Sequence, residues 1–221
     1  MGSERIMRIK GVIFDMDNTL LQSRIDFHGM KSEIHKYLVE LGVAPSALPL
    51  QKLTTSMLID QAVLSGRMDA ASMKQMWNIA KKYEIAGMKN AELEPGARKL
   101  LDFLKDKLRL VVVTNNSGEA AETALSENGI SSYFDLVVGR EFMGRMKPEP
   151  DGFVYVAEKF REELAVQDWL AVGDSWIDRQ ASEAAGIEFV AYRPEADKWN
   201  AAGVQPGNSI DQWSEFFHYL K

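Results

Sequence analysis

The stretch Gly11–Leu21 reads GVIFDMDNTLL. It begins with apolar residues and then places two carboxylates, Asp15 and Asp17, two positions apart. A continuous apolar run is typical of a strand that is covered on both faces of a sheet. Two neighbouring carboxylates repel each other, so their pairing is costly unless a cation offsets the repulsion. The stretch therefore predicts a buried strand that carries acidic groups at its end for a chemical purpose.

Four further apolar runs resemble the first, and together they give five predicted strands: Lys10–Phe14, Arg109–Thr114, Leu136–Gly139, Trp169–Gly173 and Glu188–Tyr192. Helical patterns separate the later runs, at Gly96–Lys107, Gly118–Asn128, Asp151–Leu164 and Ile177–Ala185. Alternation of strand and helix at this spacing is typical of βαβ units on a parallel sheet. The sequence therefore predicts an α/β fold, closed by a short helix in the C-terminal tail.

The interval between the first two predicted strands is unusually long. Residues 22–93 show helical periodicity and no convincing strand, with predicted helices at Lys31–Leu41, Leu50–Ser65 and Ala70–Ile85. A crossover between parallel strands needs only about a dozen residues. We therefore expect an inserted α-helical cap domain over residues 22–93, on a core domain made of residues 1–21 and 94–221. A long helical connection packed on the sheet is the alternative.

Composition narrows the class of protein. The chain has 221 residues, of which 46% are hydrophobic, and a net charge of −6 with no cysteine. These values predict a globular core, and they exclude disulfides, thiol catalysis and zinc–thiolate sites. The negative charge and the lack of a basic stretch argue against a nucleic-acid partner. No apolar run approaches the roughly 20 residues of a membrane span, and the first residues lack a signal-peptide layout. We expect a cytoplasmic protein that binds neither nucleic acid nor membrane.

Residues that can do chemistry lie at or near the ends of the predicted strands. Ligands of open parallel sheets bind beyond the carboxyl ends of the strands. We therefore expect one sheet edge to gather Asp15, Asp17, Thr114, Lys147 and Asp174.

Such a cluster suits the transfer of a phosphoryl group. Carboxylate oxygens without nearby cysteine or histidine favour a hard cation, Mg²⁺ first of all. Lys147 and Thr114 add a positive charge and a hydroxyl donor for an anion with several oxygens. Asp15 could then attack phosphorus to form an aspartyl-phosphate. Asp17 could protonate the leaving oxygen and afterwards deprotonate a water molecule.

Four ordered segments resemble the successive motifs of the haloacid dehalogenase-like superfamily: DMDNT (15–19), Thr114, KPEP (147–150) and GDSWID (173–178). The resemblance extends from about Ile9 to Arg193, and four motifs in order are far more specific than any one. The helical insertion is similar to the C1 cap of the phosphoglycolate phosphatase and β-phosphoglucomutase branch. This resemblance implies a Rossmann-like sheet of five strands in the order 3-2-1-4-5.

The resemblance also implies roles for individual residues. Asp15 would be the nucleophile and a Mg²⁺ ligand, and Asp17 would be the acid/base and give its backbone carbonyl to the metal. Thr114 and the backbone amide of Asn115 would hold the phosphoryl group, which Lys147 would neutralise.

Two further aspartates complete the implied metal site. Asp174 would ligate Mg²⁺, and Asp178 would bind or orient a metal-bound water, with a purely structural role for Asp178 as the alternative.

Two positions depart from the family pattern. Asn18 stands where glycine is common, but asparagine also accepts turn conformations. Met146 replaces a small residue before Lys147, so we expect the loop on the phosphate side to differ slightly in shape.

Substrate contacts in the insertion are the least defined. His28 lies one residue beyond the place where β-phosphoglucomutases carry a cap histidine that assists the acid/base step. Arg24, Lys31 and Arg67 are further cations that could meet a substrate, and an exposed surface charge is the alternative for each.

The sequence thus favours a Mg²⁺-dependent phosphatase that acts on a small phosphorylated metabolite, of the phosphoglycolate or sugar-phosphate type. A phosphomutase of the β-phosphoglucomutase type is the alternative, and a non-catalytic binding module is a third possibility. Carbon–halogen cleavage is disfavoured because it would leave Asp17 and Asp174 without a role. A monomer is the default expectation, and the oligomeric state stays open.

Overall fold

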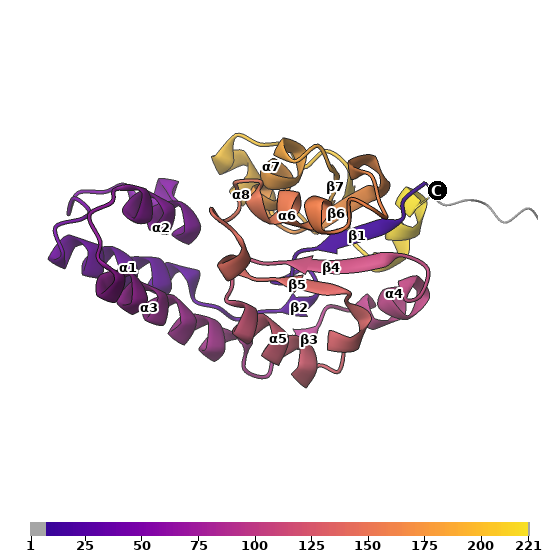
Figure 1. Cartoon of the computed structure of the whole chain (residues 1–221), viewed down its shortest axis with the longest axis horizontal. Helices are drawn as coiled ribbons and strands as arrows, with labels where there is room; N and C mark the ends of the chain where they lie inside the picture. The colour runs from indigo at the N-terminus through magenta and orange to yellow at the C-terminus, as the bar shows by residue number, and fades with distance from the viewer. Residues whose placement is uncertain (1–7, 221) are drawn as a thin grey trace, which may run out of the picture.

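A six-stranded parallel sheet forms the centre of the computed structural model, which describes residues 8–220 (Figure 1). Its strands, in spatial order, are β5 (Leu136–Val138), β4 (Arg109–Val113), β1 (Gly11–Phe14), β6 (Trp169–Gly173), β7 (Glu188–Tyr192) and β8 (Ser209–Ile210). The first five are the predicted strands in the predicted order. The predicted count of five is wrong by one, because β8 has two residues and no apolar run that could reveal it.

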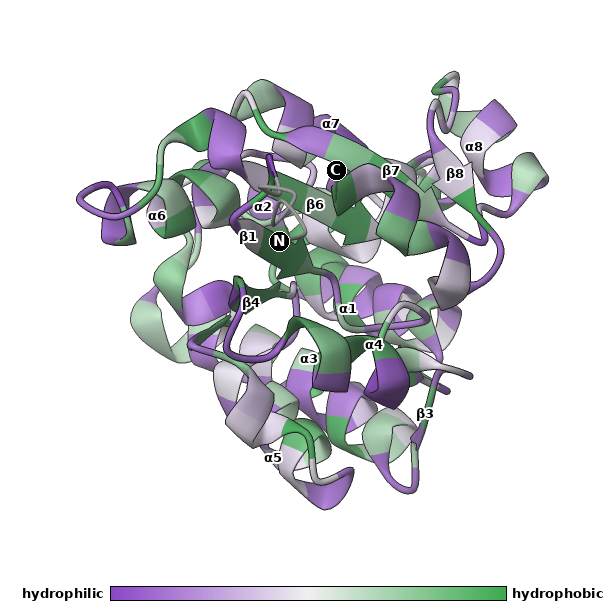
Figure 2. Cartoon of the chain, turned by 90° about the vertical axis from the view of Figure 1, so that its right-hand side faces the viewer, coloured by the Kyte–Doolittle hydropathy of each residue, from purple (hydrophilic) through white to green (hydrophobic). Residues whose placement is uncertain are grey.

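Helices cover both faces of the sheet, and the side chains of each strand alternate between two cores. Val12 and Phe14 point into the core that holds α4 (Ala97–Leu104) and α5 (Gly118–Glu127). Ile13 and its neighbours point into the other core, formed with the helices α6 (Asp151–Lys159), α7 (Trp176–Ala184) and α8 (Ala196–Ala202). Figure 2 shows the hydrophobic strands between more polar helices. Burial on both faces explains why the strands are continuously apolar.

The long interval between β1 and β4 is mainly helical, as predicted. It contains α1 (Phe27–Glu40), a short 3₁₀ turn (Leu50–Lys52), α2 (Thr55–Leu64) and α3 (Ala70–Met88). The first helix begins four residues before its predicted start, because the Asp26 side chain caps it by accepting a hydrogen bond from the amide of Gly29 at 2.8 Å. In Figure 1 these helices lie beyond the carboxyl ends of the sheet strands.

Two short antiparallel strands flank these helices. Leu21 of β2 (Leu21–Gln22) pairs with Leu93 of β3 (Glu92–Leu93). The expectation that residues 22–93 contain no strand is therefore wrong, because strands of two residues are too short to show a period. As a result, the chain leaves the core and returns to it at adjacent positions.

The C-terminal segment packs against the sheet as a 3₁₀ helix, Trp213–Leu220. Trp213 stacks on Tyr192 with ring centroids 4.3 Å apart, and its edge meets Phe14 at 6.0 Å. The predicted closing helix is confirmed at this position, although it is a 3₁₀ helix and so is wound more tightly than an α-helix. Residues 1–7 and 221 of the predicted core domain lie outside the described residues. Within residues 8–220, no helix is both long and apolar enough to cross a membrane.

Candidate active site

Lys147 occupies the centre of a polar cluster beyond the carboxyl ends of β1, β4 and β6. Its ammonium group donates to Asp15 Oδ1 at 2.6 Å, to Asp178 Oδ1 at 2.6 Å and to the carbonyl oxygen of Val113 at 2.9 Å. The residue is only 1% exposed. Burial alone would lower the pKa of Lys147, but the carboxylates of Asp15 and Asp178 outweigh it and raise that pKa above its ordinary value. All three donors are satisfied, so Lys147 is a fixed charge of the site.

The carboxylates around Lys147 are in excess. Asp15, Asp174 and Asp178 each offer an oxygen within 4.8 Å of the other two. Removal from water, followed by repulsion from Asp15, raises the pKa of Asp174 well above its ordinary value. Burial also raises the pKa of Asp178 to about 6, although Lys147 acts against it. One ammonium cannot balance three carboxylates, and a set of oxygen donors with surplus negative charge fits a hard divalent cation such as Mg²⁺.

Asp17 lies beside this cluster with its two oxygens in different surroundings. Its Oδ2 accepts a hydrogen bond from the Asn116 side chain at 2.8 Å, whereas its Oδ1 is buried and has no partner among the described residues. Desolvation, and then repulsion from Asp15, raises the pKa of Asp17 to about 7. A carboxyl group with this pKa can give and take a proton near neutral pH. The next residue, Asn18, has a φ of 55°, which confirms that asparagine accepts the turn conformation expected there.

The segment Thr114–Ser117 follows β4 and contains Thr114 and Asn115, which the sequence predicts to bind a phosphoryl group; because of that prediction it is called here the phosphoryl-binding loop. Thr114 is fully buried, and its hydroxyl oxygen accepts from the amide of Asn116 at 3.2 Å. The Asn115 side chain pairs with the backbone of Lys147: its amide group donates to the Lys147 carbonyl at 2.9 Å, and its oxygen accepts from the Lys147 amide at 2.9 Å. The role predicted for Asn115 concerned only its backbone, so this side-chain clamp was missed.

The helices of the insertion contact the site at two places. From α2, the Ser56 hydroxyl donates to the Lys147 carbonyl at 2.8 Å. From α3, Glu84 forms a buried ion pair with Arg140, which follows β5. None of these three residues, nor Asn116, was predicted. The signal for Glu84 was an acidic residue on the buried face of α3, eight positions after Met76. The signal for Asn116 was the repeated asparagine at the end of an apolar strand.

The structure does not bring the predicted cations of the insertion into the cluster. Arg24 and His28 are exposed, and in the described range neither makes a side-chain hydrogen bond or ion pair with the cluster. Lys31 donates to the carbonyls of Leu50 and Leu53 at 2.7 and 2.6 Å, so it braces the chain before α2. Arg67 is exposed as well.

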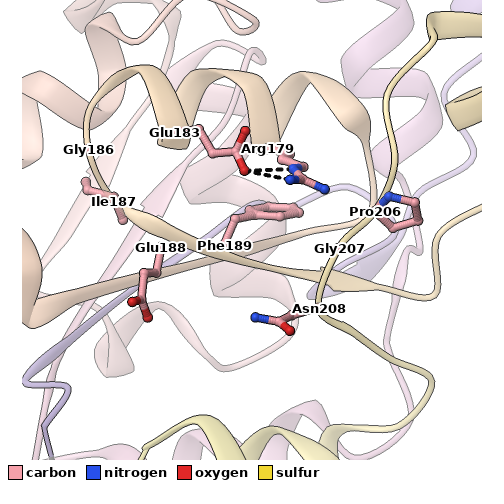
Figure 3. A pocket seen from close by; sticks show the side chains of 9 residues that line it. All are labelled: Arg179, Glu183, Gly186, Ile187, Glu188, Phe189, Pro206, Gly207 and Asn208. Atoms are coloured by element: carbon pink, nitrogen blue, oxygen red, sulfur yellow. Dashed lines mark hydrogen bonds and ion pairs between the residues drawn. The ribbon is translucent and has the colours of Figure 1, made fainter.

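A cavity of about 530 Å³ lies elsewhere, between α7 and the edge formed by β7 and β8 (Figure 3). Arg179 and Glu183 of its wall form an ion pair with each other at 2.8 Å. Glu188, the first residue of β7, also lines it, so the cavity opens toward the amino ends of the strands. It contains none of the predicted site residues.

Comparison with known proteins gives consistent matches. The model of the haloacid dehalogenase-like hydrolase family matches residues 12–192. A phosphoglycolate phosphatase from Cereibacter sphaeroides is 30% identical over 192 residues, which cover 82% of this chain and 84% of that protein. A phosphoglycolate phosphatase from Nitrosospira multiformis is 30% identical over 189 residues, covering 80% of each.

Solved structures share the fold. A putative phosphoglycolate phosphatase from Lactobacillus plantarum superposes with a TM-score of 0.67 at 21% identity, covering 96% of this chain and 99% of that one. The putative HAD-hydrolase YfnB from Bacillus subtilis, solved bound to magnesium, has a TM-score of 0.63 at 22% identity, covering 97% of this chain and 99% of that one.

Proposed function

The chain belongs to the haloacid dehalogenase-like hydrolase family, and we propose that it is a Mg²⁺-dependent phosphatase of a small phosphorylated metabolite. The family match and the phosphatase relatives confirm the predicted enzyme class, a phosphoric monoester hydrolase. One observation carries the proposal. Lys147 bridges Asp15 and Asp178 in a cluster of carboxylates, and Asp17, which follows the same strand, has a buried oxygen without a hydrogen-bond partner among residues 8–220.

In the proposed reaction, Asp15 is the nucleophile. Lys147 binds its Oδ1, and no hydrogen bond within the described residues engages its Oδ2, which is free to attack phosphorus. The bond between phosphorus and the substrate oxygen breaks as the aspartyl-phosphate forms, and Asp17 gives its proton to the leaving oxygen. Water then attacks the phosphorus of the aspartyl-phosphate and passes a proton to Asp17. Inorganic phosphate leaves, and the Asp15 carboxylate is restored.

The acidic cluster is the proposed metal site. The side chains of Asp15 and Asp174 and the backbone carbonyl of Asp17 would hold Mg²⁺, with Asp178 orienting a bound water. When bound, Mg²⁺ would neutralise negative charge on the phosphoryl oxygens. The surplus of carboxylates over ammonium groups supports this assignment, as does the magnesium bound in the structure of YfnB.

Lys147 and the phosphoryl-binding loop are proposed to hold the transferred group. Thr114 and the backbone amide of Asn115 would donate to its oxygens, while Lys147 would offset their charge. The side-chain clamp between Asn115 and Lys147 supports this role, because it fixes the two donors relative to each other.

For the substrate we propose a metabolite of the phosphoglycolate or sugar-phosphate type. The activity named for the relatives supports this choice, and so do the helices α1–α3, which lie over the carboxyl ends of the strands. We propose that residues 22–93 form a cap domain on a core of residues 1–21 and 94–221, and that Arg24 or His28 meets the substrate when it is bound. The cytoplasmic location and the monomeric state stay predictions from the sequence.

A phosphate-release screen tests the proposal. Phosphoglycolate, sugar phosphates, nucleotides and phosphoamino acids are incubated with the protein, with and without Mg²⁺, and Asp15→Asn is the matched control. We expect release from at least one small substrate, only with Mg²⁺ and only in the parent. Activity that survives excess chelator would contradict the metal assignment, and an active Asp15→Asn would contradict the nucleophile. Substrate loss without stoichiometric phosphate would favour the phosphomutase alternative.

A further inference from the structure

Glu84 and Arg140 form a buried ion pair between α3 and the core. Their side chains are 3% and 7% exposed. Glu84 belongs to the inserted helices, whereas Arg140 follows β5 at the carboxyl edge of the sheet. The Arg140 guanidinium also lies over the ring of Trp77 on the same helix, 4.7 Å from its centroid. Two residues of α3, Trp77 and Glu84, thus contact the Arg140 side chain.

Both members of the pair also bind the phosphoryl-binding loop. The second oxygen of Glu84 accepts a hydrogen bond from the amide of Ser117 at 3.2 Å. Arg140 donates from its side chain to the carbonyl of Asn115 at 3.4 Å and from its backbone to the carbonyl of Asn116 at 3.0 Å. Three consecutive residues of the loop, 115–117, are therefore hydrogen-bonded to this one pair.

The surroundings of the pair leave the loop little room to shift. A Cβ at Gly139 would lie 2.3 Å from the amide nitrogen of Gly118, so the chain before Arg140 touches the first residue of α5. The carboxylate of Glu141 accepts from the same amide at 2.9 Å. The phosphoryl-binding loop, the start of α5 and the end of β5 therefore form one close-packed unit. From α3, Glu84 contacts this unit.

Stability alone does not account for a pair of this kind. Burying two charges costs several kcal/mol of desolvation for each ion, and apolar residues of similar volume often serve a fold equally well. Charged partners do, however, make stronger and more directional hydrogen bonds than neutral ones. Here those bonds end on the backbone of the phosphoryl-binding loop.

We propose that Glu84 and Arg140 are positioning residues that fix the phosphoryl-binding loop from the side of the inserted helices. The inference rests on the proposed function, because it assigns the loop to phosphate. It means that the position of α3 and the affinity of the loop for phosphate are coupled: α3 cannot withdraw without releasing the Ser117 amide and unpairing Arg140.

Direct binding of inorganic phosphate tests this inference. Calorimetry in saturating Mg²⁺ compares the parent with Glu84→Gln, which keeps the size of the side chain but loses its charge. Lys81→Ala is the matched control, because Lys81 also joins α3 to α5, through an ion pair of 2.6 Å with the exposed Glu119. We expect Glu84→Gln to weaken phosphate binding about tenfold, as a coupling of ordinary size would do, and Lys81→Ala to change it less than about twofold.

A second variant separates positioning from a purely structural role. Glu84→Gln/Arg140→Met removes both charges, so no unpaired charge stays buried, and the fold should recover stability relative to Glu84→Gln. Positioning predicts that phosphate affinity stays low in this double variant, with KM raised for any substrate. Recovery of the affinity together with the stability, or a Glu84→Gln that binds phosphate as the parent does, would overturn the inference.

The two proposals fail in different ways. A parent that binds phosphate but releases none from any substrate would overturn the proposed function, and the affinities of the variants would still decide the role of Glu84. A parent that binds no phosphate would overturn both.

Discussion

Lys147 determines the charge balance of the site, because it is the ammonium group that the surrounding carboxylates share. Its side chain is 2% exposed and contacts two carboxylates at 2.6 Å each. Removing one member of a buried ion pair destabilises a fold more than replacing the whole pair by apolar residues does, because the remaining charges stay desolvated.

We therefore expect Lys147→Met to lower the free energy of unfolding by about 3–5 kcal/mol in Mg²⁺-free buffer. Without the ammonium, the pKa of Asp178 rises further in the folded state, so the loss should grow as the pH rises from 5 to 8. Chemical denaturation at both pH values measures it. Lys10→Met is the control, since Lys10 pairs with Asp168 at 3.1 Å on the surface with its side chain 56% exposed. Equal losses in the two variants would contradict the prediction.

Asp17 illustrates a conflict between stability and activity at one residue. Its pKa of about 7 lies above the ordinary value of 3.8, so the folded state binds the proton more tightly than the unfolded state does. The free energy of unfolding therefore falls as the pH rises from about 4 to about 7, and the penalty is complete above pH 7.

Asp17→Asn removes this penalty and keeps an oxygen for the Asn116 bond. At pH 8 without Mg²⁺ we expect a gain in stability on the order of 2 kcal/mol, together with a fall in kcat of about 10²–10⁴-fold. Thermal unfolding at pH 4 and pH 8 measures the first effect, and the gain should vanish at pH 4. A variant that is less stable than the parent at pH 8 would show that the carboxylate is not destabilising in the fold.

The return of α3 to the core depends on one close approach. A Cβ at Gly87 would lie 2.4 Å from the backbone Cα of Ile25, and the carbonyl of Gly87 accepts from the amide of Arg24 at 3.0 Å. The last turns of α3 therefore pack directly on the chain that leads into α1.

Gly87→Ala should destabilise the protein although alanine is the better helix former by about 1 kcal/mol. Overpacking against backbone typically costs about 1–3 kcal/mol, so we expect a net loss of about 1 kcal/mol. Gly118→Ala is the matched control in α5, where the nearest atom to an added Cβ is 3.5 Å away. Its stability should be unchanged or higher. Denaturant midpoints compare the two, and a stabilised Gly87→Ala would refute the close packing.

Elements with a long periodic pattern were predictable, and short ones were not. The five apolar runs specify five strands because four are buried on both faces and the edge strand β5 is partly buried, and their order followed from the family resemblance. β2, β3 and β8 have two residues each, so no period exists to detect.

The residues of the candidate site also divide into predictable and unpredictable ones. Residues that follow long strands, such as Asp15, Thr114 and Asp174, could be placed at one edge from the sequence alone. Ser56 and Glu84 reach that edge only through the path of α2 and α3, and this path depends on tertiary packing that no local pattern encodes. Lys31 was predicted as a cation that meets a substrate, or else as an exposed surface charge, but its ammonium donates to the carbonyls of Leu50 and Leu53.

The whole molecule should respond to Mg²⁺ as a ligand of the folded state. The pKa values of Asp174, a proposed ligand, and of Asp178, which would orient a metal-bound water, are both raised, so protonation of either side chain opposes metal binding. Binding should therefore release protons and should weaken as the pH falls through about 6.

At a Mg²⁺ concentration of 100 times Kd, the gain in unfolding free energy should be about 2.7 kcal/mol. We expect a rise in Tm with Mg²⁺ that is larger at pH 8 than at pH 5.5 and is abolished by chelator. Asp174→Asn should lose most of the rise, whereas Asp168→Asn, in which the changed residue precedes β6 at the opposite end of that strand from Asp174, should retain it. A rise of equal size in Asp174→Asn would place the metal elsewhere.

If residues 22–93 form the proposed cap domain, the pairing of β2 with β3 would make the inserted helices exchangeable as a module. Since Leu21 and Leu93 are neighbours across that pair, a two-residue hairpin turn could join the strands and excise everything between them. The excised form would lose Glu84 and Ser56, which now bind Arg140 and the Lys147 carbonyl. Both groups would then be exposed and would have to be hydrogen-bonded by water. The same junction would accept a foreign insert whose ends are equally close, and a graft that supplies a partner for Arg140 in place of Glu84 would change what reaches Asp15 while keeping the phosphoryl-binding loop in position.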